Sequence, residues 1–512
     1  MGSDQSSVLV VDFGAQYAQL IARRIRELGV KSELTYPEKL LVDIKAINPV
    51  GIIFSGGPDS VYSPGSPRVD HNVYSQNIPI LGICYGAQLI AQDLGGEVSE
   101  TSSKEFGRSE VTVLDDSLLL KNLQTTESFW MSHSDSISKP PEGAEVIATS
   151  GGSPVCAFQD KQKRIFGVQF HPEVIHSENG LEVLKNFVFD ICQATRNWTT
   201  SSILGDLIEG VKQQVKDEKA ICALSGGIDS AVAAGVVSRA IGSNLTAVFI
   251  DTGLLRQNEA EEVEKAFKGE LGVNLIKVDA SKKFLSALSG VTNPEQKRKI
   301  IGGLFVEVLE EVAQSIGDVK YLVQGTLYPD VVESGNGKSG LIKTHHNVGG
   351  LPEKMKLKLV EPLRELFKDE VRKLGLELGL PEDLVYRQPF PGPGLAVRIV
   401  GEVTERRLEI LRKADAIISD EIRRARLHRK LWQYFAVLLA VKTVGVQGDL
   451  RSYSYPIVIR TVEAQDAMTA DWARLPYDLV ERISNRITSE VKEVNRVVLD
   501  VTSKPPGTIE WE

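Results

Sequence analysis

Cysteine is scarce in this sequence: the 512-residue chain contains only four. A disulfide-stapled fold needs a much higher cysteine density, so that class is excluded. The four positions, Cys84, Cys156, Cys192 and Cys222, include no C-x-x-C pair, which argues against a structural zinc site. We therefore expect reduced thiols and a cytoplasmic protein, in which Cys84 is the one cysteine placed for chemistry.

Long apolar runs are also missing. No segment approaches the ~18 consecutive apolar residues that a membrane-spanning helix requires. The apolar stretch at residues 435–441 is too short and is expected to form a core helix. Asp4 and Gln5 stand where a signal peptide has its basic and apolar regions. The sequence therefore predicts no membrane partner.

Positive charge is not in excess. The 59 Lys and Arg residues stand against 68 Asp and Glu residues, which gives a net charge of −9. A surface with this balance argues against broad binding to nucleic acid or to acidic membranes. It still allows a local basic pocket for a phosphorylated small molecule.

The remaining composition, 42% hydrophobic and 25% charged, is that of a globular protein. At ~150 residues per domain, the length suggests three domains. Apolar strand patterns alternate with helix patterns, for example at 8–11, 51–54, 220–224 and 245–250. This alternation predicts α/β architecture with two doubly wound parallel sheets.

A Pro/Gly cluster at 389–394 interrupts the alternation, and the pattern after it changes to α+β. A polar stretch at 197–202 marks an earlier linker. The predicted fold is therefore two doubly wound α/β domains followed by a C-terminal α+β domain. The predicted domains are 1–195, 196–388 and 389–512.

Cys84 lies between a strand pattern and a helix pattern, in the run Gly-Ile-Cys-Tyr-Gly at 82–86. Small neighbours let the chain turn sharply and expose the sulfur, as in a nucleophile elbow. The N-terminus of the following helix favours the thiolate form, and its N–H groups, Tyr85 among them, can hold an oxyanion. Gly56 and Gly57, at the end of another strand, are candidates for a second donor.

His171 is the candidate base for this thiol. It follows a strand pattern, and Pro172 disfavours helix there, so His171 and Glu173 are expected on one face of an extended segment. The carboxylate then orients the imidazole while the ring relays protons. His133, in Ser-His-Ser-Asp at 132–135, is a candidate substrate-loop residue.

Together, Gly-Ile-Cys-Tyr-Gly-x-Gln at 82–88 and Gln-Phe-His-Pro-Glu at 169–173 resemble the class I glutamine amidotransferases. This resemblance covers about residues 7–195. It implies that glutamine is hydrolysed through a Cys84 thioester to glutamate and ammonia, with His171 and Glu173 completing a triad. It also implies that Gly57, Tyr85 and Gln88 contact glutamine or its oxyanion.

A second motif follows a strand and opens a helix. It consists of Ser225, Gly226, Gly227, Ile228, Asp229, Ser230 and Ala231. Glycines allow close backbone approach, and a helix N-terminus binds anions, so the loop is expected to hold phosphates. The motif lacks the Gly-Lys-Ser/Thr of a Walker A loop and resembles the ATP pyrophosphatases instead. That resemblance implies cleavage of ATP between its α- and β-phosphates, and Asp229 is a candidate for holding Mg²⁺.

Residues 335–340 fit G-x-G-x-x-G by letter, but they neither follow a buried strand nor open a clear helix. We interpret them as a flexible loop and not as a dinucleotide site. The stretch after them carries Lys343, His345 and His346 between glycines. It is a candidate for a lid that closes on phosphates.

Further segments extend the resemblance over nearly the whole chain. Phe-Ile-Asp-Thr-Gly-Leu-Leu-Arg at 249–256, the Pro/Gly run at 389–396 and the tail at 504–512 resemble the glutamine-hydrolysing GMP synthases. The resemblance implies that xanthosine 5′-monophosphate (XMP) is adenylated by Mg²⁺-bound ATP and then aminated to GMP, with AMP and pyrophosphate released. No organic cofactor is expected.

The same resemblance implies the acceptor contacts. Arg298, Lys504, Ile509 and Glu510 are the candidate XMP-binding residues. Gly392 and Gly394 are candidates to present backbone N–H groups to the nucleotide phosphate, and Gln447 and Arg451 are weaker candidates. Because the C-terminal segment resembles the family's dimerisation domain, a homodimer is expected.

Two alternatives stay open at this point. One is an amidotransferase with another acceptor, such as deamido-NAD, against which the tail and the 389–396 run argue. The other is a catalytically idle nucleotide-binding regulator of the same fold. The intact Cys84, His171, Glu173 and Asp229 argue against that regulator.

Overall fold

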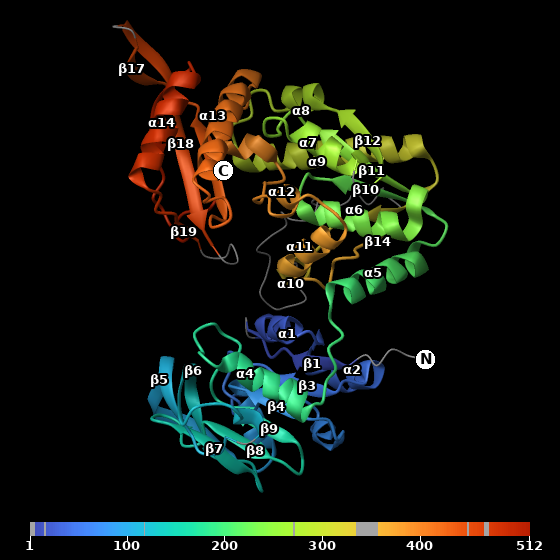
Figure 1. The fold of residues 1–512 in the computed structure, drawn as a ribbon, viewed down its shortest axis with the longest axis vertical. Coiled ribbons are helices and arrows are strands. Elements are labelled where there is room, and N and C mark those ends of the chain that lie inside the picture. Colours follow the sequence, from blue (N-terminus) through green and yellow to red (C-terminus); the bar gives the residue numbers. More distant parts are fainter. Residues whose placement is uncertain are drawn as a thin grey trace. The chain divides into compact units, whose positions relative to one another are not determined.

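The computed structural model describes residues 6–14, 17–116, 118–269, 272–333, 357–447, 450–464 and 470–512. The chain folds into two compact units, residues 1–202 and residues 203–512 (Figure 1). The finer division predicted from the sequence, with boundaries after residues 195 and 388, stays a prediction.

The first unit is built on a nine-stranded sheet in the order β2-β1-β3-β4-β9-β8-β7-β5-β6. The strands are β1 (Ser7–Val11), β2 (Lys31–Thr35), β3 (Gly51–Phe54), β4 (Ile80–Ile83), β5 (Glu97–Val113), β6 (Thr126–Lys139), β7 (Glu145–Ser150), β8 (Ala157–Asp160) and β9 (Ile165–Val168). The pairs from β2 to β9 are parallel, and those from β9 to β6 are antiparallel. The expected doubly wound α/β pattern is confirmed, with a β-rich extension.

The parallel strands are buried on both faces because helices cover both. Along β1, Val8 and Val10 pack into one hydrophobic cluster, whereas Leu9 and Val11 pack into another. Alternate residues of a strand point to opposite faces, so a fully covered strand must be apolar throughout. The helices are α1 (Ala18–Glu27), α2 (Leu40–Ile47), α3 (Tyr85–Asp93) and α4 (Gly180–Lys185), which continues as a π-helical segment, Asn186–Ile191.

The second unit contains a five-stranded parallel sheet in the order β12-β11-β10-β13-β14. Its strands are β10 (Lys219–Leu224), β11 (Leu245–Asp251), β12 (Asn274–Asp279), β13 (Val319–Val323) and β14 (Lys358–Val360). The helices are α5 (Thr200–Val215), α6 (Ile228–Ile241), α7 (Glu259–Gly269), α8 (Ser281–Ala287), α9 (Pro294–Ile316), α10 (Tyr328–Glu333), α11 (Lys368–Glu377) and α12 (Glu382–Val385). This sheet is the second predicted α/β arrangement.

A mixed sheet follows, as the α+β pattern predicts. Its strands are β15 (Ile399–Val400), β16 (Gln433–Leu439), β17 (Thr443–Gln447), β18 (Leu450–Glu463), β19 (Asp471–Trp472) and β20 (Val494–Leu499). The long strand β18 pairs with β16, β17, β19 and β20. Two helices pack against this sheet: α13 (Glu405–Arg424) lies against β16 and β18, and α14 (Tyr477–Glu490) lies against β20. One hydrophobic core runs from the parallel sheet into this part, from Ile221 to Val494.

The expectation of a core helix at residues 435–441 is wrong, because residues 435–439 belong to strand β16 and residues 440–441 form no helix. Ala436 and Leu438 pack into one hydrophobic cluster, while Phe435 and Val437 pack into another. A strand buried on both faces is apolar at every position, and a short run of this kind cannot be distinguished from a buried helix by periodicity. Among the described helices, none combines the length and the apolarity that a bilayer crossing requires.

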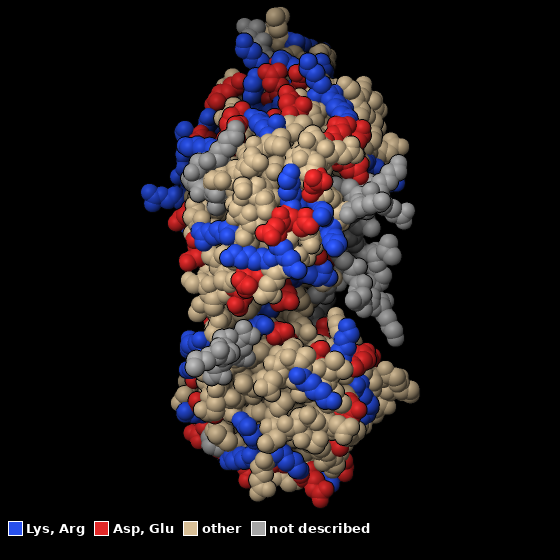
Figure 2. All heavy atoms as spheres, turned by 90° about the vertical axis from the view of Figure 1, so that its right-hand side faces the viewer, with Lys and Arg blue, Asp and Glu red and all other residues tan. Residues whose placement is uncertain are grey.

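Charged side chains of both signs share the surface. On the face drawn in Figure 2, Lys and Arg side chains lie among Asp and Glu side chains in both units. This distribution agrees with the small net charge of −9.

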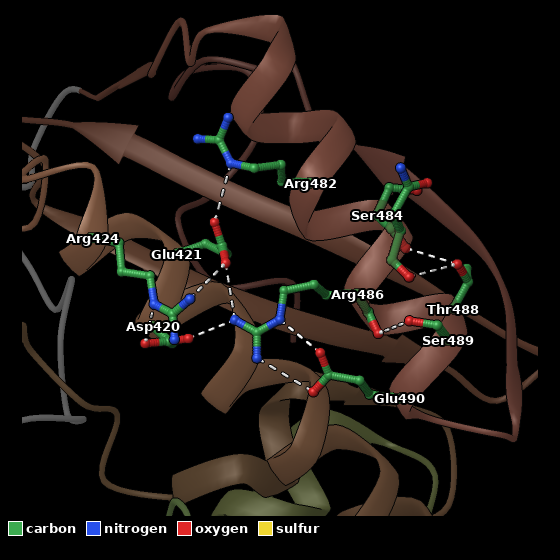
Figure 3. Close-up of polar contacts among 10 residues, drawn as sticks. Asp420, Glu421, Arg424, Arg482, Ser484, Arg486, Thr488, Ser489 and Glu490 are labelled. Atoms are coloured by element: carbon green, nitrogen blue, oxygen red, sulfur yellow. Dashed lines mark hydrogen bonds and ion pairs between the residues drawn. The ribbon is translucent and has the colours of Figure 1, made fainter.

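An ion-pair network joins α13 to α14 (Figure 3). Arg486 Nη1 lies 2.9 Å from a carboxylate oxygen of Glu421 and 2.5 Å from one of Asp420, and Arg486 Nε lies 2.7 Å from Glu490. Arg482 Nε also reaches Glu421, at 3.4 Å. Glu421 is only 4% exposed. A network with one buried carboxylate stabilises more than an isolated surface pair does.

We expect Arg486→Gln to loosen α14. Removing the guanidinium leaves the buried Glu421 with weaker compensation, so the free energy of local opening should fall by roughly 1 kcal/mol. That loss makes amide hydrogen exchange in α14 about five-fold faster, measured by mass spectrometry. Arg474→Gln is the control, because Arg474 forms an exposed pair with Asp471. Equal exchange rates in the two variants would contradict the assignment.

Candidate active site

Cys84 lies in the sharp turn between β4 and α3, with φ 51° and ψ −107°. A positive φ is strained for a residue with a side chain, so the surroundings must hold it there. A Cβ atom at Gly82 would lie 2.6 Å from the Ala87 nitrogen, and one at Gly86 would collide with the Phe54 carbonyl. Only glycine fits at these two positions, and the elbow geometry depends on both.

His171 and Glu173 lie together at the end of β9. His171 Nδ1 is 2.8 Å from Glu173 Oε1, and the two side chains are 3% and 0% exposed. Burial opposes the imidazolium form, but Glu173 and the Cys84 sulfur outweigh it and raise the pKa of His171 well above its ordinary value. The structure therefore brings together the three residues of the predicted triad.

Neighbouring side chains fix the backbone of this segment. Ser177 donates its hydroxyl to the His171 carbonyl at 2.6 Å, and Arg24 Nε donates to the Glu173 carbonyl at 2.9 Å. The ring of Tyr17 contacts the imidazole at a centroid distance of 5.2 Å. These contacts hold the imidazole in one orientation, as a proton-transferring group would require.

The three predicted glutamine contacts surround the elbow. The Tyr85 ring packs so closely on Gly57 that a Cβ at Gly57 would lie 2.9 Å from it. The first N–H of a helix has no intrahelical partner, so the N–H of Tyr85, the first residue of α3, can serve a ligand. Gln88 is buried, and its amide donates to the Asp135 carbonyl at 2.9 Å.

Asp135, on β6, was missed by the sequence reasoning. Its carboxylate accepts a short hydrogen bond from Ser60 and a 2.7 Å bond from the Tyr62 hydroxyl. Gln88 and Gln169 both donate to its carbonyl. Asp135 thus fastens the segment after Gly57 to the strand beside the thiol. Residues far apart in the sequence make these contacts, so spacing gave no signal for them.

His133 lies on the same strand and is 5% exposed. Its Nε2 is 3.5 Å from Glu105 Oε2. Burial lowers the pKa of His133, although Glu105 partly opposes the shift. The charge of His171 also acts on it. The structure therefore places this candidate near the triad, where burial disfavours its charged form.

The second motif forms a loop between β10 and α6. Ser225 Oγ and Ser230 Oγ are 3.1 Å apart, and Ser230 Oγ also donates to the Gly227 carbonyl at 3.1 Å. Gly226 has φ +74°, a conformation that side chains rarely adopt. A Cβ at Gly325 would lie 2.7 Å from the Asp229 backbone, so the segment after β13 seals the loop. The helix N-terminus after this loop suits an anion.

Lys368, the first residue of α11, was also missed. Its Nζ lies 2.7 Å and 2.6 Å from the two carboxylate oxygens of Asp229. Arg387 Nη1 approaches the Gly226 carbonyl at 3.4 Å. Lys368 is 139 residues away from Asp229 in the sequence, which explains why no motif indicated it. Two cations therefore lie beside the loop, and each is paired with a carboxylate: Lys368 with Asp229, and Arg387 with Glu262.

The described residues contain no group of three or more His, Cys, Asp or Glu side chains arranged for a metal ion. Asp229 is a single carboxylate, and it is about one-third exposed. Mg²⁺ commonly binds through one or two carboxylates plus substrate phosphates, so this donor set fits an ion that arrives with a nucleotide.

The predicted acceptor residues gather around the tail. Arg298, on α9, donates from Nη2 to the Glu512 carbonyl at 2.6 Å. Glu510 accepts two bonds from Arg398, at 3.0 Å and 2.8 Å. Ile509 is buried. Lys504 pairs with Ala470 through backbone hydrogen bonds.

The remaining candidates are more scattered. Gly394 has φ +62° and packs against the Leu254 carbonyl, whereas a Cβ at Gly392 would meet no atom within 4 Å. Arg451 is exposed on β18. The Gln447 side chain and the lid candidates Lys343, His345 and His346 lie outside the described residues.

Comparison with known proteins gives three family matches along the chain. Residues 9–191 match glutamine amidotransferase class-I, residues 202–304 match NAD synthase, and residues 420–511 match the GMP synthase C terminal domain. Each match covers a different segment, in the order that the predicted domains follow.

Curated relatives match over the full length. The chain is 57% identical over 514 residues to "GMP synthase [glutamine-hydrolyzing]" of Parafrankia sp., covering 99% of this chain and 96% of the relative. It is 56% identical over 507 residues to the protein of the same name from Carboxydothermus hydrogenoformans, covering 99% and 100%. Among solved structures, a glutamine amidotransferase from Thermotoga maritima is 18% identical, with a TM-score of 0.29, over 42% of this chain and 85% of that one.

We expect Glu173→Gln to lower the pKa of His171, because glutamine keeps the size of the side chain but removes the charge that favours imidazolium. The His171 titration, followed by NMR of histidine-labelled protein, should move to lower pH. A raised histidine pKa stabilises the fold below about pH 6.5, and this stability is lost as pH rises through the folded-state pKa. The variant's loss of stability should therefore be greatest on the acidic side.

Glu105→Gln is the matched control for this experiment. Glu105 acts on His133, so its removal should lower the pKa of His133 and leave the His171 titration in place. An unchanged His171 titration in Glu173→Gln would contradict the triad electrostatics.

Proposed function

This chain belongs to the family of glutamine-hydrolysing GMP synthases, and from that premise we propose that it aminates XMP to GMP with ammonia from glutamine. ATP is cleaved to AMP and pyrophosphate in the same reaction. The observation that carries the proposal is the presence of both chemical sites in one chain: a Cys–His–Glu cluster and a phosphate-binding loop. Full-length relatives of that name support it.

Cys84, His171 and Glu173 are the proposed catalytic residues of the glutaminase. The Cys84 sulfur attacks the side-chain amide of glutamine, and the oxyanion lies against the N–H groups of Tyr85 and Gly57. His171 gives its proton to the departing ammonia and later takes one from the water that cleaves the thioester. The buried Glu173, 2.8 Å from Nδ1, keeps the ring oriented and favours its charged form.

The loop from Ser225 to Ala231 is the proposed ATP site. Its backbone N–H groups and serine hydroxyls face the phosphates, and bound Mg²⁺ supplies charge neutralisation of the leaving pyrophosphate. Asp229 is the carboxylate that would hold this ion. Lys368, released from Asp229 on binding, is then free to pair with a phosphate oxygen. Adenylation of the purine C2 oxygen turns it into a good leaving group. Ammonia then attacks C2 and AMP departs.

XMP is the proposed acceptor, bound by Arg298, Lys504, Ile509 and Glu510. Arg and Lys suit its phosphate. The NAD synthase match supports deamido-NAD as an alternative acceptor, but that match covers only residues 202–304. The relatives that match the whole chain, including the tail, carry the GMP synthase name, which favours XMP.

A homodimer formed through the C-terminal sheet is also proposed. The β17–β18 pair exposes a group of apolar side chains to solvent, which is unfavourable in a monomer: Val444, Val446, Leu450 and Tyr453. A symmetric partner that presents the same strands would cover them. The four unpaired thiols support the proposed cytoplasmic location.

The division of labour is tested with Cys84→Ala. Glutamine-dependent GMP formation should fall by at least about 10³-fold, whereas ammonia-dependent formation persists, because only the glutaminase loses its nucleophile. Pyrophosphate release is measured with either nitrogen source, with XMP or with deamido-NAD as the acceptor.

Cys192→Ala is the control, since burial raises the pKa of that thiol and keeps it unreactive. Loss of both activities in Cys84→Ala would contradict separate sites. A wild-type protein that is inactive with every acceptor would support the idle regulator instead.

Val446→Asp tests the dimer. A buried aspartate at the symmetric contact is costly, so the variant should sediment as a monomer while the wild type sediments as a dimer. Val446 is 75% exposed in the single chain. Val42→Asp, at another exposed valine, is the matched control and should stay dimeric. A monomeric wild type, or a dimeric Val446→Asp, would contradict this interface.

A further inference from the structure

Three buried cations of the second unit are directed at the tail, and their partners within it lie at residues 508–512. The cations are Lys297, Arg398 and Arg460, and each side chain is 0% exposed. Isolated buried charges are costly, so each must be compensated by its partners. In every case at least one of these partners is a carboxylate or a carbonyl of the tail.

Lys297, on α9, holds the end of the tail. Its Nζ makes a short ion pair with the Glu512 carboxylate and donates to the carbonyls of Ala396 and Ile399 at 3.2 Å and 2.8 Å. The other Glu512 oxygen accepts from the Gly401 N–H at 3.1 Å. The Glu512 side chain therefore bridges α9 and the start of the mixed sheet.

Arg398 holds Glu510 with a bidentate pair, at 3.0 Å and 2.8 Å. Its guanidinium lies 3.9 Å above the centroid of the Phe435 ring on β16. A planar fork clamped between a ring and a carboxylate has little freedom to turn. Glu510 is thus fixed in position as well as in charge.

Arg460, on β18, holds the backbone. It donates to the carbonyls of Thr502, Thr508 and Ile509 at 2.6 Å, 3.0 Å and 3.3 Å. Its Nη1 also lies 3.3 Å from Asp500. One buried side chain therefore ties the two ends of the segment 502–509 to the central strand.

We infer that Lys297, Arg398 and Arg460 are positioning residues for the acceptor nucleotide, which hold the tail in its binding conformation before the nucleotide arrives. The inference rests on the proposed function, in which Ile509 and Glu510 contact XMP. It adds residues that act through the tail and do not touch the substrate themselves.

The physical reason is the conformational entropy of the segment. An untethered tail would have to be ordered when the nucleotide binds, and that cost would be subtracted from the affinity. A tail already fixed by buried ion pairs presents Glu510 at no further cost. Apolar residues would give the fold as much stability as buried charges do, so the charges are better explained by the single geometry that they specify.

Arg298 shares this arrangement. It follows Lys297 on α9, and its Nη2 donates to the Glu512 carbonyl. The residue proposed for the nucleotide phosphate therefore lies against the same tail residue that Lys297 holds. Displacing Glu512 moves a partner of Arg298 as well.

The test compares Lys297→Met, Glu512→Gln and Arg398→Lys in the full chain. We expect the KM for XMP to rise about 10- to 100-fold in Lys297→Met, because a small displacement of binding groups has effects of that size. Glu512→Gln should show part of this rise. The KM for ATP and the basal hydrolysis of glutamine should stay within about two-fold of wild type.

Arg398→Lys keeps the charge and loses the bidentate fork, so its effect should be intermediate. Lys283→Met is the matched control: it removes an exposed lysine that pairs with Glu307 and Glu311, and it should leave the KM for XMP unchanged. In the double variant Lys297→Met/Glu512→Gln, the rise should not exceed that of Lys297→Met alone.

Two results would overturn the inference. One is an unchanged KM for XMP in Lys297→Met while limited proteolysis shows that the tail is released. The other is an equal worsening of the KM for XMP, the KM for ATP and the rate of glutamine hydrolysis, which indicates general unfolding. If the wild type does not aminate XMP at all, the proposed function fails instead, so the two failures are distinguishable.

Discussion

Both chemical sites depend on the same constraint: a parallel strand ends, the chain turns at once, and a buried helix begins. In the first unit this junction joins β4 to α3 and holds Cys84; in the second it joins β10 to α6 and holds the loop at Ser225. The unpaired N–H groups at the start of each helix attract negative charge. One junction presents the Cys84 sulfur beside these groups, and the other leaves the space to a phosphate in the function that we propose. The chemistry differs because the turn residues differ.

Much of this arrangement could be predicted because the residues concerned are local in sequence. The elbow around Cys84, the pair His171 and Glu173, and the loop at 225–231 each lie within a few residues of a strand end, where composition and turn geometry indicate a site. Lys368 and Asp135 escaped prediction because their contacts are tertiary. Lys368 meets Asp229 from 139 residues away, and no spacing rule connects them. Strand β16 was mistaken for a helix because burial on both faces removes the alternation that identifies a strand.

The two units compensate buried charge in different ways. Around His171, burial opposes the charged form of the ring, whereas Glu173 and the Cys84 sulfur favour it and raise its pKa. Because Cys84 takes part in this balance, the pKa of His171 can change when the sulfur reacts. In the second unit, burial lowers the pKa of Lys297, and the charge of Glu512 opposes this shift. The donors of the Lys297 ammonium are occupied by fixed partners. The first arrangement suits proton transfer, and the second suits holding a shape. Burial of a charged group thus accompanies proton transfer in the first case and a fixed conformation in the second.

The tail contacts also form in a fixed order relative to synthesis. Lys297 pairs with a residue that lies 215 positions later in the chain. At the usual ribosomal rate, roughly 10 to 40 s separate the appearance of these two partners. Until then Lys297 lacks the carboxylate that compensates its charge in the folded unit. This ion pair therefore forms late, long after the strands β10 and β11 of the parallel sheet have been synthesised.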